Sequence, residues 1–349
     1  MCVQNAPRTE RGRGRSARKT TPLDHEKSQD WWGNAVRGCH AATVVVAVLV
    51  VILSMTGCGA TTTSPAQPGG PSGPGGGPVV TAAASINAWG SLLSQLGGTH
   101  VQARSIIANP DTDPHDYEPS PADGKTIANS ALFVENGVGY DPWAAKALAA
   151  SPNPQRVVID VGQVVGVAEG GNPHRWYSPT DVDKVADAIT AGLKKADPGD
   201  GAYFDAQRQS FENSGLATYH RLINAIKAKY AGTPVGASES IFAPLADALG
   251  LNLLTPPSFL KAISEGTDPS AADKATLDAQ ITGKQIKVYV YNSQNSTPDV
   301  ARQVEEAKKA GIPVSTVTET LSPAGASFQD WQSTQLQALQ TALAQARGS

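Results

Sequence analysis

The chain has 349 residues, with 28 Lys and Arg against 31 Asp and Glu, and an ordinary globular composition of 40% hydrophobic and 17% charged residues. A chain of this length exceeds the size at which one hydrophobic core usually keeps growing, so we expect two lobes or domains. Eight basic and four acidic residues precede Cys58, which leaves 20 basic and 27 acidic residues, a net charge of about −7, from Cys58 onward. This mildly acidic body argues against nucleic acid as a partner, because phosphate binding needs a basic surface.

The N-terminal segment 1–57 has the charge order of an export signal. Several Arg and Lys residues precede the apolar run 41–57, which is short for a membrane span of about 20 residues. The run ends in Met-Thr-Gly-Cys, which resembles a lipobox, so Cys58 is expected to be lipidated and to become the mature N-terminus. An uncleaved anchor helix is the alternative. Both interpretations place the rest of the chain outside the cytoplasmic membrane.

No cysteine or methionine follows Cys58 in the sequence. Cys2, Cys39 and Cys58 are the only cysteines, and both methionines precede Cys58. The body therefore has no internal disulfide and no thiolate ligand, which excludes a copper(I) or iron–sulfur site. Residues 58–78 start with the lipidated Cys and continue almost entirely in Thr, Ser, Pro and Gly, the composition of a flexible tether.

From residue 79 onward, short β-branched runs alternate with helical patterns, which predicts an α/β fold built from parallel sheets flanked by helices. The predicted strands are 79–83, 101–107, 131–134 and 156–160 in a first lobe, and 234–237, 251–255, 286–291 and 313–317 in a second. We expect an N-terminal lobe over 79–200 and a C-terminal lobe over 231–349.

Residues 201–230 carry apolar side chains at near-helical spacing and are predicted to form one long helix that joins the lobes. A single linking helix is expected to be a rigid hinge that permits little relative motion. Ser120 and Ser178, each followed by Pro and an acidic residue, predict N-caps of two further helices. An amphipathic helix is predicted from Phe328 to the C-terminus.

Two histidines lie in matching segments upstream of those N-caps. They are His115 in Asp-Pro-His-Asp-Tyr and His174 in Asn-Pro-His-Arg-Trp. Proline restricts its own φ and the residue before it, so each imidazole is held on a stiffened backbone, as a metal ligand requires. A single loop histidine is more often just solvated, but the repetition favours a shared role.

Two glutamates occupy equivalent places in the second lobe. Glu239 follows the strand 234–237, and Glu319 follows the strand 313–317. Open α/β sheets bind ligands beyond the carboxyl ends of their strands, where all four candidates fall. Two neutral imidazoles and two carboxylates balance a divalent cation, so the ion can be buried in the cleft between the lobes.

These segments resemble the cluster A-I solute-binding proteins, the TroA-like zinc- and manganese-binding lipoproteins of bacterial ABC importers, from about residue 79 to the C-terminus. The segment 113–123 is similar to the first-ligand loop of that family and makes His115 the first ligand. Asn-Pro-His-x-Trp implies His174, and Glu-Ser-Ile-Phe implies Glu239, a position that is often His in zinc-type members and Glu in manganese-type members. Glu319 stands where the family usually has Asp. The His-rich loop of some zinc-binding members is missing.

The resemblance implies a binding protein rather than an enzyme. It would hold one Zn²⁺ or Mn²⁺ ion, deliver it to an ABC-transporter permease and its ATPase, and work as a monomer anchored by lipid on the extracytoplasmic face of the cell membrane. By this resemblance Glu239 favours manganese, whereas a site of nitrogen and oxygen ligands generally binds zinc more tightly.

Alternatives remain open at this point. Two histidines and two carboxylates also suit a zinc-dependent hydrolase, although catalytic zinc usually keeps three protein ligands and an open position. A metal-binding surface adhesin with the same fold is another candidate. The remaining histidines are expected to be removed with the signal or to be structural or solvated: His25, His40, His100 and His220. A group of amides that follows the strand 286–291 is expected either to hydrogen-bond the ligands or to cap the next helix: Asn292, Gln294 and Asn295.

Overall fold

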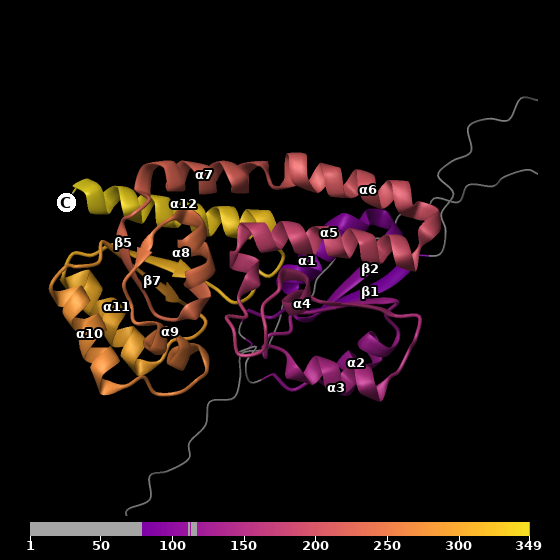
Figure 1. Cartoon of the computed structure of the whole chain (residues 1–349), viewed down its shortest axis with the longest axis horizontal. Coiled ribbons are helices and arrows are strands. Elements are labelled where there is room, and N and C mark those ends of the chain that lie inside the picture. Colours follow the sequence, from indigo (N-terminus) through magenta and orange to yellow (C-terminus); the bar gives the residue numbers. More distant parts are fainter. Residues whose placement is uncertain (1–78, 111, 113–116, 349) are drawn as a thin grey trace, which may run out of the picture. The chain divides into compact units, whose positions relative to one another are not determined.

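The computed structural model describes residues 79–110, 112 and 117–348 (Figure 1). The predicted export signal, Cys58 and the tether lie outside the described residues. Within the described part, the strands form two four-stranded parallel sheets, one in each half of the sequence, with helices packed against them. The predicted α/β architecture with two lobes is therefore confirmed. No helix among these residues combines the length and the hydrophobicity that a bilayer crossing requires.

The first sheet has the strand order β2-β1-β3-β4. Its strands are β1 (Val80–Ile86), β2 (Val101–Ile107), β3 (Leu132–Glu135) and β4 (Val157–Asp160). The helices of this lobe are α1 (Asn87–Gly97), α2 (Pro121–Ala128), α3 (Pro142–Ala150), α4 (Val161–Val165) and α5 (Pro179–Ala196). Short 3-10 turns are Gly98–His100, Arg175–Tyr177 and Pro198–Asp200. β1 is central because its register pairs it with both β2 and β3.

The second sheet repeats the arrangement in the order β6-β5-β7-β8. Its strands are β5 (Pro234–Ala237), β6 (Asn252–Leu253), β7 (Val288–Asn292) and β8 (Val314–Val317). The helices are α8 (Ala243–Leu249), α9 (Pro257–Ser264), α10 (Ala271–Thr282), α11 (Pro298–Lys309) and α12 (Phe328–Gly348), with a 3-10 turn at Ser240–Phe242. β5 and β8 flank β7, so the carboxyl ends of these three parallel strands lie side by side.

The predicted linking helix is helical over nearly its whole length but is not uniform. It consists of α6 (Gly201–Ser210), a π-helical turn (Phe211–Gly215) and α7 (Ala217–Tyr230), which follow one another along the upper side of Figure 1. The amide of Leu216 donates to the carbonyl of Phe211 at 2.8 Å, which is the i→i+5 bond of a π turn.

The C-terminal helix α12 makes a second crossing between the lobes. It begins against α1 of the first lobe, where the amide of Phe328 donates to Ser91 Oγ at 2.9 Å and the side chains of Gln95 and Gln329 exchange hydrogen bonds. It then packs along α7 and against β8 of the second lobe. One helical segment therefore connects the lobes, as the sequence predicted, and α12 adds a second helix that packs on both lobes.

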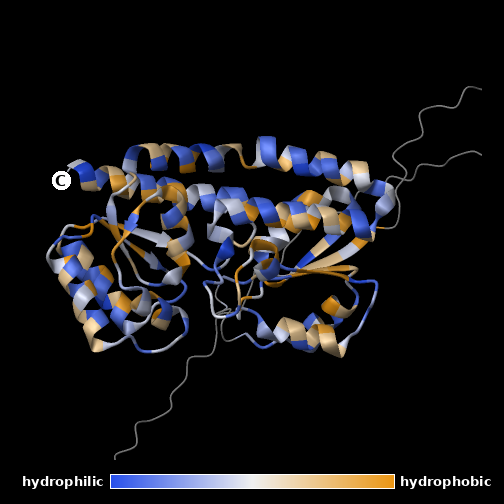
Figure 2. Ribbon diagram, in the orientation of Figure 1, coloured by the Kyte–Doolittle hydropathy of each residue, from blue (hydrophilic) through white to orange (hydrophobic). Residues whose placement is uncertain are grey.

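Both predicted helix starts lie where expected, but only one is capped as expected. Ser120 forms a full capping box with Asp123 at the start of α2. Ser178 precedes α5, but its side chain makes no capping bond to the backbone. Hydrophilic and hydrophobic residues alternate along the helices in Figure 2. The largest buried cluster contains residues of both lobes.

Candidate metal centre

The carboxyl ends of the second sheet bring both predicted glutamates together. Glu239 lies two residues beyond β5 and Glu319 two residues beyond β8, with the last residue of β7, Asn292, between them in the sheet. The exposed fractions of these side chains are 0%, 2% and 0%. Two carboxylates are thus buried side by side. Burying two negative charges costs free energy unless a cation or several hydrogen-bond donors interact with them.

The third predicted ligand comes from the first lobe. His174 lies in the loop between α4 and α5 and is fully buried. Its Nδ1 lies 2.9 Å from Asn172 Oδ1, and an amide oxygen can only accept, so Nδ1 carries the proton. Nε2 is then the nitrogen that can coordinate a metal, and it lies 3.4 Å from Glu319 Oε1.

The distances suit a small divalent cation. One ligand atom from each of His174, Glu239 and Glu319 lies within 4.8 Å of the other two. Tetrahedral zinc with bonds of about 2.0–2.1 Å places neighbouring ligand atoms about 3.3 Å apart. The 3.4 Å between His174 Nε2 and Glu319 Oε1 is close to this edge length.

His115, the remaining predicted ligand, lies outside the described residues, as does Cys58. The described segments on either side of His115 end at Thr112 and resume at Tyr117. The assignment of His115 therefore stays a prediction from the sequence.

Three neutral side chains donate to the carboxylates. Asn292 Nδ2 donates to Glu239 Oε1 at 2.8 Å and to Glu319 Oε1 at 2.9 Å. Asn295 Nδ2 donates to Glu239 Oε2 at 2.7 Å, and the hydroxyl of Tyr140 donates to Glu319 Oε2 at 3.0 Å. Donors of this kind orient a carboxylate before an ion arrives.

Only some of these supporting residues follow from the sequence. Asn292 and Asn295 hydrogen-bond the glutamates, as one of the two interpretations expected. Gln294 does not: its Nε2 reaches the carbonyl of Pro110 at 2.6 Å in the first lobe. The capping alternative is wrong, because Thr297 caps α11.

Tyr140 was missed, and the reason lies in the turn that carries it. Gly137, Val138 and Gly139 all have positive φ, and Asp141 accepts the amides of Asn136 and Gly137 at 2.7 and 2.8 Å. Positive φ is rare for a β-branched residue such as valine. This tight turn aims Tyr140 across the lobe boundary at Glu319, and no strand-end pattern in the sequence marks it.

Burial and mutual repulsion dominate the electrostatics. Burial first, and then the charge of Glu319, raise the pKa of Glu239 well above its ordinary value. Burial, followed by the charge of Glu319, also raises the pKa of Tyr140 well above its ordinary value, so this phenol keeps its proton and remains a donor. A divalent cation between the carboxylates would reverse the shift of Glu239.

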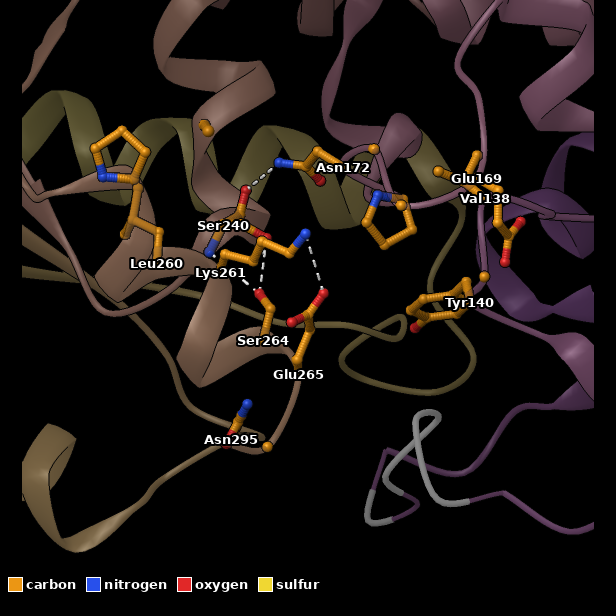
Figure 3. Close-up of a pocket in the computed structure, with 17 residues that line it drawn as sticks. Val138, Tyr140, Glu169, Asn172, Ser240, Leu260, Lys261, Ser264, Glu265 and Asn295 are labelled. Atoms are coloured by element: carbon orange, nitrogen blue, oxygen red, sulfur yellow. Dashed lines mark hydrogen bonds and ion pairs between the residues drawn. The ribbon is translucent and has the colours of Figure 1, made fainter. Parts of the chain in front are cut away.

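A cavity of about 690 Å³ adjoins the centre (Figure 3). Tyr140 and Asn172 line it from the first lobe, and Ser240 and Asn295 from the second. Asn172 Nδ2 donates to the carbonyl of Ser240 at 2.7 Å across this boundary. All four residues also hydrogen-bond His174, Glu239 or Glu319, so the cavity reaches the residues that support the centre.

The other described histidines lie elsewhere. His100 contacts Asp200 at 2.5 Å and stacks on Tyr203. His220 lies near Glu212 and Asp183, and these three could also approach one ion. They are only partly buried, however, and Arg208 already pairs with Glu212 at 2.9 Å. This second group is consistent with a network of surface charges.

The fold and the centre together define a two-lobed binding protein with a buried histidine–carboxylate site at the lobe boundary. The chain belongs to the family described as zinc-uptake complex component A, periplasmic, whose profile matches residues 82–342.

Named relatives and solved structures agree with this family. The chain is 24% identical over 169 residues to the manganese-binding lipoprotein MntA of Halalkalibacterium halodurans, covering 47% of this chain and 53% of that one. It is 24% identical over 228 residues to the high-affinity zinc uptake system protein ZnuA of Bacillus subtilis, covering 60% and 70%. The chain thus spans about half the length of the MntA relative. A periplasmic metal-binding protein from Candidatus Liberibacter asiaticus has the same fold, with a TM-score of 0.64 and 19% identity over 76% of this chain and 99% of its own.

Proposed function

We propose that this protein captures one divalent transition-metal ion, zinc or manganese, outside the cytoplasmic membrane and delivers it to the permease of an ABC importer. The observation that carries the proposal is the convergence of His174, Glu239 and Glu319, buried and within 4.8 Å of one another, at the boundary of the lobes. His115 is proposed as the fourth ligand. Two neutral imidazoles and two carboxylates then cancel the charge of the ion.

Capture rather than catalysis is favoured by the surroundings of the ligands. A catalytic zinc usually keeps an open coordination position for water and has a general base nearby. Here both glutamates are buried and serve as proposed ligands, and their hydrogen-bond partners Asn292, Asn295 and Tyr140 are amides and a phenol that keeps its proton. These neighbours can orient ligands, but they are not suited to activate water at neutral pH.

The partners and the location follow from the family and the predicted lipobox. We propose a lipid anchor at Cys58, a monomeric binding protein on the outer face of the membrane, and a permease with its ATPase as partners. Relatives named as a manganese-binding and a zinc uptake protein support a transported ion of this class.

The test is calorimetric titration of the full-length chain, purified in detergent, with Zn²⁺ and with Mn²⁺. We expect one tightly bound ion per chain, and loss of uptake of that ion when the gene is deleted. Two ions bound equally tightly, or metal-dependent hydrolysis of ester or peptide substrates, would contradict the proposal.

A further inference from the structure

Asn292 occupies a special place in the second sheet. It is the last residue of β7, between the strands that precede Glu239 and Glu319, and it is fully buried. Its backbone amide donates to Ser238 Oγ at 3.0 Å, and its Oδ1 accepts the amide of Gln294 at 3.0 Å. Because Oδ1 is used in this way, the NH₂ group must face the carboxylates.

That single NH₂ group serves both glutamates. Its two hydrogens are directed at Glu239 Oε1 and Glu319 Oε1, at 2.8 and 2.9 Å. Asn295 and Tyr140 each donate to one of the two carboxylates. A planar amide has fixed angles between its N–H bonds, so a donor shared in this way constrains the separation of the two carboxylates and offsets part of their repulsion.

We infer that Asn292 is a positioning residue that sets the spacing of Glu239 and Glu319, and through it the affinity and the metal preference of the centre. The inference rests on the proposed function, because it assigns a role at the same site. A carboxylate spacing that is fixed before binding favours an ion of matching size. The 3.4 Å between His174 Nε2 and Glu319 Oε1 is close to the ligand spacing of zinc, and Mn²⁺ is larger than Zn²⁺. Loosening the carboxylates should therefore weaken zinc more than manganese.

The experiment compares the full-length wild-type chain with Asn292→Ala and Asn292→Gln. Loss of a residue that orients metal ligands typically lowers affinity about 10- to 100-fold, and we expect a decrease of this size for zinc in Asn292→Ala, together with a smaller ratio of zinc to manganese affinity. Asn292→Gln keeps a buried amide but displaces it by one methylene. We expect it to lower zinc affinity as well, whereas a residue that only satisfies buried polar groups would be replaced without loss.

Gln303→Ala is the matched control. Gln303 is also a fully buried amide of the second lobe, but it accepts from the hydroxyl of Tyr289 at 3.0 Å and touches neither carboxylate. Its removal should lower the thermal stability and leave the zinc affinity and the zinc-to-manganese ratio unchanged. The visible spectrum of bound Co²⁺ gives an independent readout, because its bands report coordination geometry: it should change in both Asn292 variants and stay constant in the control.

The possible outcomes distinguish a failure of the proposed function from a failure of the positioning role of Asn292. If the wild-type chain binds no zinc, the proposed function fails. If it binds one zinc ion and both Asn292 variants retain its affinity, metal ratio and cobalt spectrum, the positioning role alone is overturned. Should Asn292→Ala unfold, Asn292→Gln decides: a wild-type affinity and spectrum there overturn the inference, and a weakened, altered site supports it.

Discussion

Removing the imidazole of His174 should weaken zinc binding by orders of magnitude and leave the fold largely intact. A structural zinc ion contributes about 10–16 kcal/mol through four ligands, which is about 2.5–4 kcal/mol per ligand. Since about 1.4 kcal/mol corresponds to a tenfold change in affinity, His174→Ala should raise the Kd for zinc roughly 10²- to 10³-fold. The structure supports full loss of the ligand, because Nε2 faces Glu319 at 3.4 Å and the ring packs edge-on against Trp176 and Tyr140.

Calorimetry with Zn²⁺ at pH 7.5, in competition with a chelator of known affinity, is the assay. His100→Ala is the matched control, since it removes an imidazole that also has aromatic and carboxylate contacts, although it is only partly buried, from a different part of the first lobe. Circular dichroism should show both variants folded. If His174→Ala bound zinc as tightly as His100→Ala, the centre would be wrongly placed and the convergence of His174, Glu239 and Glu319 would have no bearing on metal binding.

Further predictions concern protons and the anchor. The raised pKa of Glu239 means that the metal-free folded chain holds a proton that the unfolded chain releases, so this group makes the metal-free protein less stable as pH rises above about 4.5, the ordinary pKa range of Glu. Zinc needs the carboxylate deprotonated, so zinc affinity should instead increase with pH; opposite pH trends of the melting temperature with and without zinc would bear this out, and parallel trends would contradict it. Burial, with the charges of Asp141 and Asp160, raises the pKa of Glu135 to about 7, so Glu135→Gln should increase the free energy of unfolding by about 1 kcal/mol at pH 8, after allowance for solvent screening, and by little at pH 5. Urea unfolding at both pH values measures this, and an equal effect at both would refute the assigned cause. Cys58→Ala should release the chain from the membrane fraction or leave its precursor uncleaved, and retention at the normal mature size would disprove the lipid anchor.

Much of the architecture could be predicted from the sequence because buried parallel strands have strong local sequence patterns. The strands 101–107 and 234–237 were predicted with the bounds that the structure has. The predicted strand 251–255 is reduced to Asn252–Leu253, since this edge strand pairs only at two positions and is soon followed by two prolines, which cannot donate to a ladder. Local pattern predicts that a strand exists, whereas its length depends on its partner.

The linking segment shows a signal that was present but was interpreted too simply. The buried residues Phe204, Phe211 and Leu216 are separated by seven and then by five positions. Seven is two α-helical turns, but a step of five is one residue too long for one turn and too short for two. The π turn between Phe211 and Leu216 accommodates this extra residue and keeps both side chains buried.

The centre was predictable where its residues follow strands and not where they arrive across the lobe boundary. Glu239, Glu319 and Asn292 follow from the rule that parallel sheets bind at their carboxyl ends. Tyr140 and the loop bond of Asn172 to Ser240 depend on how the two lobes meet. The contact between the lobes is determined by packing between residues that are far apart in sequence, and the hydrophobic periodicity of the sequence does not predict it.

The two helical elements that pack on both lobes, the α6–α7 segment and α12, limit the motions that can expose the ion. His174 belongs to one lobe and the glutamates to the other, so the centre opens only if the contacts between them break. A rotation of whole lobes would bend both the α6–α7 segment and α12, each with a buried apolar face. Displacing only the segment 172–174, ahead of the buried Trp176, breaks hydrogen bonds such as those from Asn172 to Ser240 and from Asn136 to Pro173, together with the ring contacts of His174. Hydrogen bonds contribute about 0.5–1.5 kcal/mol each, whereas burying one large apolar side chain contributes about 1.5–3 kcal/mol, so the architecture favours opening by loop displacement.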